Sequence, residues 1–274
     1  MKRLVILLAI LLCATGNSIA QNEPSTREMN YINWQEFAEF VPGTIETVLL
    51  PVGTLEPHGV GPNGADNIAP EAMAGDLAPK LNALIAPTLN YGITGSLKAY
   101  PGNFAISEEA YRLFIRDILK GLAKNKFKNI IILNGHGGPQ TGVLNALASA
   151  VSDELKVRVL VINWWSAASE DTFAVFGENG GHAGNNETAY VQAIVPEHIH
   201  KERYTGKEMA TPFPSGGSWS AHPFPSSIGL YQANQGYPNF DEAQAKDYFE
   251  RVNSRVEGII KDVIKKWDLA NLYR

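Results

Sequence analysis

The chain has 274 residues, of which 23 are basic and 28 are acidic, for a net charge of −5, and it contains one cysteine. A chain of this length can bury a substantial core in one domain, or at most two. The mild acidity, without any basic run, argues against binding to nucleic acid.

The first twenty residues have the features of a signal peptide. A positive start at Lys2 and Arg3 precedes an unbroken apolar run over residues 4–12, and a polar stretch with small residues ends at Ala20. The apolar run is shorter than the roughly 20 residues that a membrane-spanning helix needs. We therefore predict cleavage after Ala20, export and no stable membrane anchor. In a cell with two membranes, the protein would be periplasmic.

Removal of this segment changes the charge and the cysteine content. The mature chain would keep 21 basic and 28 acidic residues, a net charge of −7, and would lose Cys13, the only cysteine. It could then form no disulfide. We expect residues 21–32 to be a loose lead-in and residues 33–274 to form a single catalytic domain.

Short apolar strands alternate with helical patterns along the rest of the chain. In order, the sequence predicts a strand over 48–53, a helical pattern through Met73, Leu77 and Leu81, a strand over 84–89, a helix over 107–125, a strand over 129–133, a helix over 140–152, a strand over 157–162, and helices over 187–195 and 241–267. Such alternation is typical of parallel strands covered on both faces. We predict an α/β fold with a mostly parallel central sheet and an active site in the loops that follow the strands.

Three polar clusters follow predicted strands. They are Glu56-Pro57-His58 with Asp66 eight residues after the histidine, then Asn134-Gly135-His136-Gly137-Gly138, then His182-Ala183-Gly184-Asn185-Asn186-Glu187. Each cluster alone has an ordinary explanation, such as a surface acid, a solvated histidine, or glycines that permit a tight turn. Together, however, they contain three of the six histidines of the chain.

Imidazole nitrogens and carboxylate oxygens are ligands that suit Zn²⁺ or Mn²⁺. Two such cations about 3.5–4 Å apart need a shared carboxylate and further protein ligands for each. Glu56, His58, Asp66, His136 and Glu187 supply this set of side chains. The sequence therefore predicts a centre for two divalent cations per chain.

These three motifs, in this order and at these separations, strongly resemble the creatininase (creatinine amidohydrolase) family over roughly residues 33 to 264. The resemblance implies a three-layer α/β/α fold, assembly as a homo-oligomer, often a hexamer, and a binuclear Zn²⁺ or Mn²⁺ centre. It also implies hydrolysis of the C–N bond of a cyclic amide, a formamide or a small peptide-like substrate by a metal-bridged hydroxide. On the matching positions, Glu56 and His136 would hold one metal, His58 and Glu187 the other, and Asp66 would bridge them. His182 would lie beside the reacting centre and stabilise the tetrahedral species or protonate the leaving nitrogen.

Some positions depart from the family pattern. Pro57 replaces the usual glutamine, and the loop from His58 to Asp66 is one residue shorter. Creatininase itself has His-Tyr-Glu where this chain has His136-Gly137-Gly138, so Glu187 must take over as ligand, as in branches that do not act on creatinine. This argues against creatinine as the substrate.

Several aromatic and histidine residues are candidates to contact the substrate. Trp164 and Trp165 follow a predicted strand and would wall the pocket, although core packing is the commoner role of adjacent tryptophans. Trp219 and His222 lie in a Gly/Ser-rich stretch that suggests a mobile flap or an inert surface loop. Two other functions stay open at this point: a mononuclear metal esterase or lactonase, and an exported binding protein with a vestigial metal site.

Overall fold

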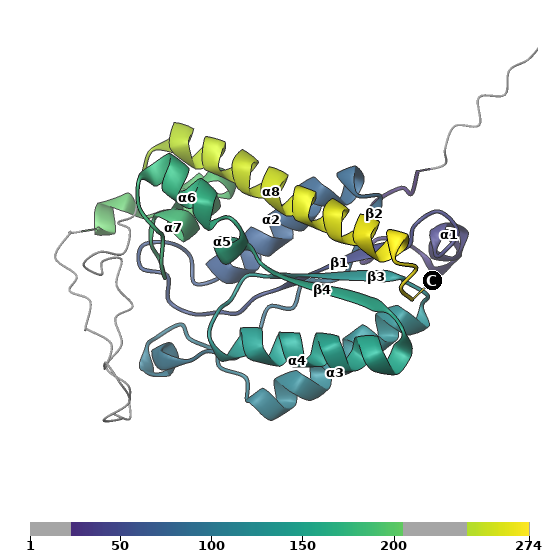
Figure 1. Cartoon of the computed structure of the whole chain (residues 1–274). Helices are drawn as coiled ribbons and strands as arrows, with labels where there is room; N and C mark the ends of the chain where they lie inside the picture. Colours follow the sequence, from purple (N-terminus) through teal and green to yellow (C-terminus); the bar gives the residue numbers. More distant parts are fainter. Residues whose placement is uncertain (1–22, 205–239, 274) are drawn as a thin grey trace, which may run out of the picture.

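The computed structural model of the chain describes residues 23–204 and 240–273 (Figure 1). The predicted signal peptide lies outside the described residues, as do Trp219 and His222. Within the described part, no helix is both long enough and apolar enough to cross a membrane.

A sheet of four parallel strands lies at the centre, in the order β2-β1-β3-β4. The strands are β1 (Thr47–Val52), β2 (Ala83–Ile85), β3 (Asn129–Asn134) and β4 (Arg158–Asn163). Every residue of β1 and β3 is buried, which explains why residues 48–52 and 130–133 form continuous apolar runs rather than alternating patterns. In the pairing register Val52 lies opposite Asn134, and Asn134 lies opposite Asn163. Three strands therefore end level with one another, and the loops that follow them start at one edge of the sheet.

Helices cover both faces of the sheet, as Figure 1 shows. On one face, α3 (Glu108–Lys124) and α4 (Pro139–Leu155) pack against Leu50 and Ile132. On the other face, α2 (Ala65–Lys80), α7 (Asn185–Ile194) and α8 (Glu242–Leu269) pack against Leu49 and Ile131. The predicted α/β architecture with a covered parallel sheet is confirmed.

The helices begin in two different ways. Asn33, Ser107 and Asp241 cap α1 (Trp34–Phe40), α3 and α8, each accepting hydrogen bonds from first-turn backbone N–H groups. By contrast, α2, α4 and α7 begin after Gly64, Gly138 and Gly184, and no side chain caps them. Uncapped helix starts carry partial positive charge and favour acidic groups beside them.

The short elements differ most from the sequence-based expectation. The strand expected over 84–89 ends at Ile85, because Pro87 lacks a backbone N–H, although the chain pairs with β1 again at Leu89. The sequence patterns did not predict α1, α5 (Trp164–Ala167), α6 (Ser169–Phe176) or the 3₁₀ turns Ser96–Ala99, Pro196–His198 and Lys201–Arg203. Part of the lead-in is tied to the sheet edge, since Met29 N–H donates to Ile85 O and Ile85 N–H donates to Arg27 O.

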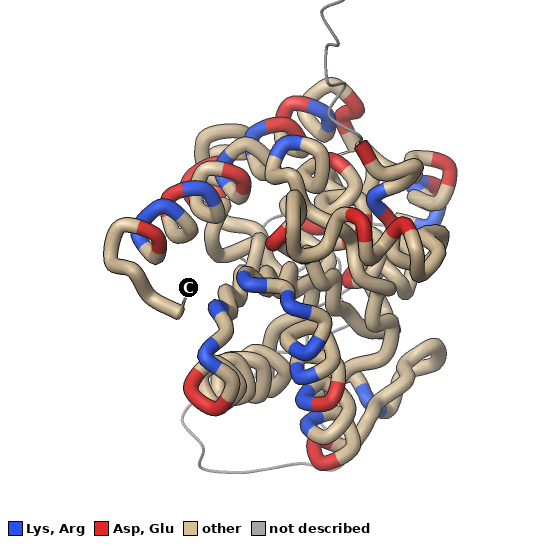
Figure 2. The backbone as a smooth tube through the Cα atoms, turned by 90° about the vertical axis from the view of Figure 1, so that its right-hand side faces the viewer, with Lys and Arg blue, Asp and Glu red and all other residues tan. Residues whose placement is uncertain are grey.

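Charges alternate along the outer helices (Figure 2). On α8, ion pairs join residues one turn apart, as at Asp247 and Arg251 and at Glu257 and Lys261. Exposed pairs of this kind contribute only about 0.3–0.5 kcal/mol each. They describe a solvated surface.

Candidate metal centre

Six side chains from the three sequence clusters meet at the edge where the strands end. Glu56 and His58 come from the loop after β1, Asp66 from the first turn of α2, His136 from the loop after β3, and His182 and Glu187 from the start of α7. Glu56, His58, Asp66 and His136 are buried, whereas the His182 side chain is 32% exposed. The site is thus an enclosed group of three carboxylates and three imidazoles with one partly open side.

Asp66 occupies the middle of this group. Its Oδ1 lies 3.0 Å from His58 Nε2, and its Oδ2 lies 2.7 Å from His136 Nδ1. On the far sides, His136 Nδ1 is 3.2 Å from Glu56 Oε1 and His58 Nε2 is 3.6 Å from Glu187 Oε2. The ligand atoms form three compact triads. Two of them, Glu56–Asp66–His136 and His58–Asp66–Glu187, share Asp66, and the third is Glu56–His58–His182.

Two glycines let α2 come close enough to place Asp66 there. A Cβ at Gly53, at the end of β1, would lie 2.2 Å from the backbone oxygen of Asp66. A Cβ at Gly135, at the end of β3, would lie 1.9 Å from the same oxygen. No side chain fits at either position, so both strand ends must be glycine for the first turn of α2 to rest on them.

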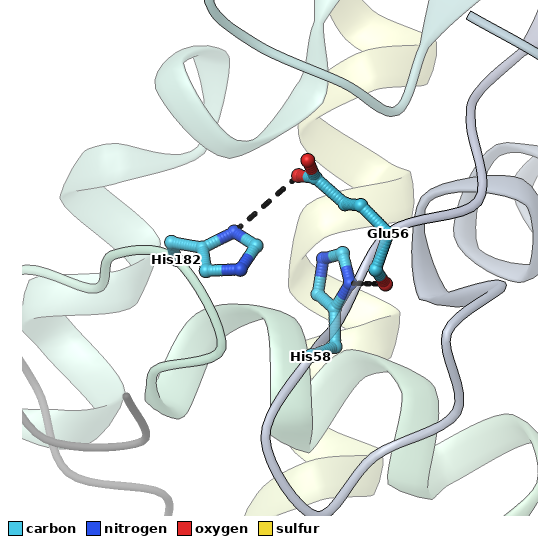
Figure 3. A group of neighbouring side chains, drawn as sticks. All are labelled: Glu56, His58 and His182. Carbon is cyan, nitrogen blue, oxygen red and sulfur yellow. Dashed lines mark hydrogen bonds and ion pairs between the residues drawn. The ribbon is translucent and has the colours of Figure 1, made fainter. Parts of the chain in front are cut away.

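Each of the three histidines is oriented by a backbone carbonyl. His58 Nδ1 bonds Glu56 O at 2.9 Å, His136 Nε2 bonds Ile93 O at 3.2 Å, and His182 Nε2 bonds Pro57 O at 2.8 Å. In every ring the remaining nitrogen faces the carboxylates, as Figure 3 shows for His182 Nδ1, which is 3.6 Å from Glu56 Oε1. Such outer hydrogen bonds fix the tautomer and aim of metal-ligating histidines.

The three carboxylates of the site favour positive charge beside them. Burial opposes charge on His58, yet Asp66, Glu187 and Glu56 raise the pKa of His58 to about 10. Burial is likewise outweighed at His136, whose pKa Asp66 and Glu56 raise well above its usual value. His58 Nε2 is nevertheless buried without a hydrogen bond of good geometry. A donor set of three acids and neutral imidazoles, with one nitrogen left unpaired, fits divalent cations in place of these protons.

The pKa values of His182 and Glu187 shift in opposite directions. Burial and the neighbouring His58 lower the pKa of His182 to about 4, so this ring is neutral at pH 7. Burial, only partly offset by His58, raises the pKa of Glu187 to about 7. Glu187 Oε2 also accepts a hydrogen bond from Ala183 N–H at 2.6 Å, which aims it into the site.

A buried amide network holds the loop that carries His136. Asn134 donates to His136 O at 2.7 Å and to Asn163 Oδ1 at 2.8 Å, and its own Oδ1 accepts from Gln140 Nε2 at 3.0 Å. Gln140 Oε1 in turn accepts from Ile93 N–H at 3.1 Å. Sequence reasoning gave Asn134 and Gln140 no role; the one signal was the polar Asn134 directly after the apolar run 130–133.

The two tryptophans predicted to contact the substrate, Trp164 and Trp165, lie in different environments. Trp164 is buried in the core and its ring lies 4.8 Å from that of Tyr190, so it has the packing role. Trp165 is partly exposed, and its Cζ2 would lie 3.5 Å from a Cβ at Gly137, next to His136. Trp165 is therefore the tryptophan placed to border the site.

Comparison with known proteins agrees with this geometry. A covered parallel sheet with clustered histidines and acids at its strand ends can hold metal ions, as the metal-dependent hydrolases of the creatininase family do. The model of the creatininase family, described as creatinine amidohydrolase, matches residues 30–255. The chain belongs to the creatininase family.

Its relatives include enzymes with different substrates. The 3-dehydro-scyllo-inosose hydrolase of Thermotoga maritima is 24% identical over 252 residues, which cover 83% of this chain and 80% of the relative. The mycofactocin precursor peptide peptidase of Mycolicibacterium smegmatis is 29% identical over 162 residues, which cover 57% of this chain and 60% of the relative.

Solved creatininase structures share the fold. A manganese form has a TM-score of 0.72 at 19% identity, and a mutant of Zn–Zn type has a TM-score of 0.71 at 20% identity. Each alignment covers 86% of this chain and 98% of the solved chain.

Proposed function

We propose that the protein hydrolyses a C–N amide bond with two divalent cations, Zn²⁺ or Mn²⁺, held by the two triads that share Asp66. The observation that carries the proposal is the position of Asp66, whose two oxygens face the imidazoles of different triads at 3.0 and 2.7 Å. A carboxylate that serves two cations at once is what a binuclear hydrolase needs. Glu56 and His136 would complete one triad, and His58 and Glu187 the other.

When bound, such cations lower the pKa of water and polarise a carbonyl oxygen. The chain itself would supply the proton transfer. His182 is neutral at pH 7, its Nε2–H is fixed on Pro57 O, and its Nδ1 points toward Glu56 and Glu187. Nδ1 can therefore accept a proton from the attacking water and return it to the nitrogen as the amide C–N bond breaks, leaving a carboxylic acid and an amine.

The substrate we propose is a cyclic amide, a formamide or a small peptide-like molecule other than creatinine. Gly137 and Gly138 support this choice, because no side chain at either position fills the space beside His136, and nothing lies within 4 Å of a Cβ at Gly138. The mycofactocin precursor peptide peptidase among the relatives supports a peptide-like substrate as well.

The test combines metal counting with a substrate screen. Metal-free protein reloaded with Zn²⁺ or Mn²⁺ should contain two equivalents per chain and release amine from members of a panel of cyclic amides, formamides and short peptides. Glu187→Gln should be inactive, whereas the matched variant Glu197→Gln, whose side chain is 66% exposed, should be fully active. One equivalent per chain, with cleavage of esters or lactones alone, would favour the mononuclear alternative.

Export and assembly belong to the same proposal. Expression with the native leader should yield a mature protein that begins at Gln21, by mass spectrometry. The same protein should elute as a homo-oligomer, a hexamer by family analogy, in light scattering. An intact Met1, or a monomer at micromolar concentration, would contradict these two points respectively.

A further inference from the structure

A small apolar cluster, separate from the two cores that flank the sheet, lies beside the metal centre. Its buried members are Val60, Ala65, Ala183, Val191 and Ile199. Val60 follows His58 by two residues, and Ala183 and Val191 lie four residues before and after Glu187. The cluster therefore gathers the backbone segments that carry His58 and Glu187.

Ile199 belongs to the cluster but lies on a different segment of the chain from the ligands. It lies between the 3₁₀ turns Pro196–His198 and Lys201–Arg203, away from every predicted ligand in sequence. Gly61 N–H donates to His58 O at 2.9 Å and closes the turn that carries His58. A Cβ at Gly61 would lie 3.2 Å from His58 O and 3.7 Å from Ile199 Cδ1. The isoleucine side chain therefore rests against the turn itself.

A backbone hydrogen bond fixes this arrangement. The residue after Ile199, His200, donates its N–H to Val60 O at 3.0 Å. Val60 and Ile199 are each only 5% exposed. The 196–203 segment thus supports the turn through one apolar side chain and one backbone hydrogen bond.

The other triad has a different support. His136 is held by the amide network of Asn134 and Gln140 and by Ile93 O, and none of these residues belongs to the small cluster. Loosening the cluster should therefore disturb His58 and Glu187 more than Glu56 and His136.

We propose that Ile199 is a positioning residue for the cation held by His58, Asp66 and Glu187. It offers no ligand atom, so its effect on that cation passes through the Val60–Gly61 turn. The role rests on the proposed two-cation centre, and it predicts that one cation position responds to Ile199 and the other does not.

The experiment is a Zn²⁺ titration of the metal-free mature chain, followed by calorimetry with a competing chelator. In Ile199→Ala, one of the two Zn²⁺ equivalents should bind with an affinity within about twofold of wild type. The affinity of the other Zn²⁺ equivalent should fall by about 10–100-fold, which is the usual cost of losing a residue that supports a metal ligand. Ile199→Val, which keeps most of the side chain, should stay near wild type for both.

Ile45→Ala is the matched control, because Ile45 is equally buried but lies in the core on the opposite face, before β1. It should lower thermal stability by a similar amount and leave both equivalents unchanged. If Ile199→Ala fails to fold by circular dichroism, Val60→Ala trims the same apolar cluster and should give the same split.

The outcomes separate the two proposals. A wild-type chain that binds fewer than two cations overturns the proposed function and this role with it. A wild-type chain that binds two, together with an Ile199→Ala chain that binds both unchanged or loses both equally, overturns the role of Ile199 alone.

Discussion

Replacing Gly135 by alanine should weaken both cation positions although no ligand is changed. A Cβ there would lie 1.9 Å from Asp66 O and 3.0 Å from Pro70 Cδ, whereas ordinary contacts begin at 3.4 Å. The start of α2 would have to move by about 1.5 Å to relieve the first contact. Asp66 moves with it, and a carboxylate shifted that far no longer matches Zn–O bonds of about 2.0–2.2 Å.

The size of the effect follows from overpacking. An extra methyl group in a tightly packed region costs about 1–3 kcal/mol. For a domain of this size that corresponds to a decrease in Tm of roughly 2–12 °C, measured by calorimetry on the metal-free protein. Zn²⁺ affinity should fall at both positions by more than the roughly 10–100-fold that loss of a supporting partner costs, because both triads share Asp66.

Gly142→Ala provides the control. Gly142 lies inside α4, and nothing is within 4 Å of a Cβ at this position. Alanine there should stabilise the helix by about 0.5–1 kcal/mol and leave the metal content unchanged. If Gly135→Ala binds two cations with wild-type affinity, the close approach of α2 to β3 is not what places Asp66.

Four further predictions concern the side chains of the site. Asp66→Asn should lose both cations in elemental analysis, whereas a centre in which Asp66 served one cation would keep the other. Zn²⁺ binding at pH 7 should release more than two protons, because His58 and His136 have raised pKa values and must become neutral, and Glu187, with a pKa of about 7, must lose its remaining proton; calorimetry in buffers of different ionisation enthalpy counts them. The raised pKa of His58 also stabilises the metal-free fold. This contribution is fully present below pH 6.5, the pKa of the histidine in the unfolded chain, and is lost as the pH rises through about 10. His182→Ala should lose most of kcat while keeping two cations, and His200→Ala, at an exposed position, should lose neither.

The long helices and strands could be predicted from sequence because their buried faces require apolar residues at regular spacing. The apolar run 130–133 in β3 and the spacing of apolar residues on α3 and α8 reflect faces that are buried in the core. The short helices α5 and α6 have too few residues for such a pattern.

The candidate site could be predicted only as a list of side chains. The motifs indicated which residues meet, but not that α2 begins at Ala65, one residue before Asp66. They also did not indicate that Gly53 and Gly135 make room for that helix, because the fit depends on a backbone more than ten residues away in sequence. The contact of Ile199 with the Val60–Gly61 turn could not be predicted for the same reason.

Anchoring every imidazole of the site on a main-chain oxygen makes its geometry independent of the side chains at those anchor positions. Pro57 illustrates this, since the carbonyl that receives His182 Nε2 is present whatever residue stands there. An enzyme built in this way can change its neighbouring side chains, and with them its choice of substrate, while its reactive apparatus keeps the same shape. The relatives of this chain at 24% and 29% identity accordingly carry the names of different substrates, 3-dehydro-scyllo-inosose and a mycofactocin precursor peptide.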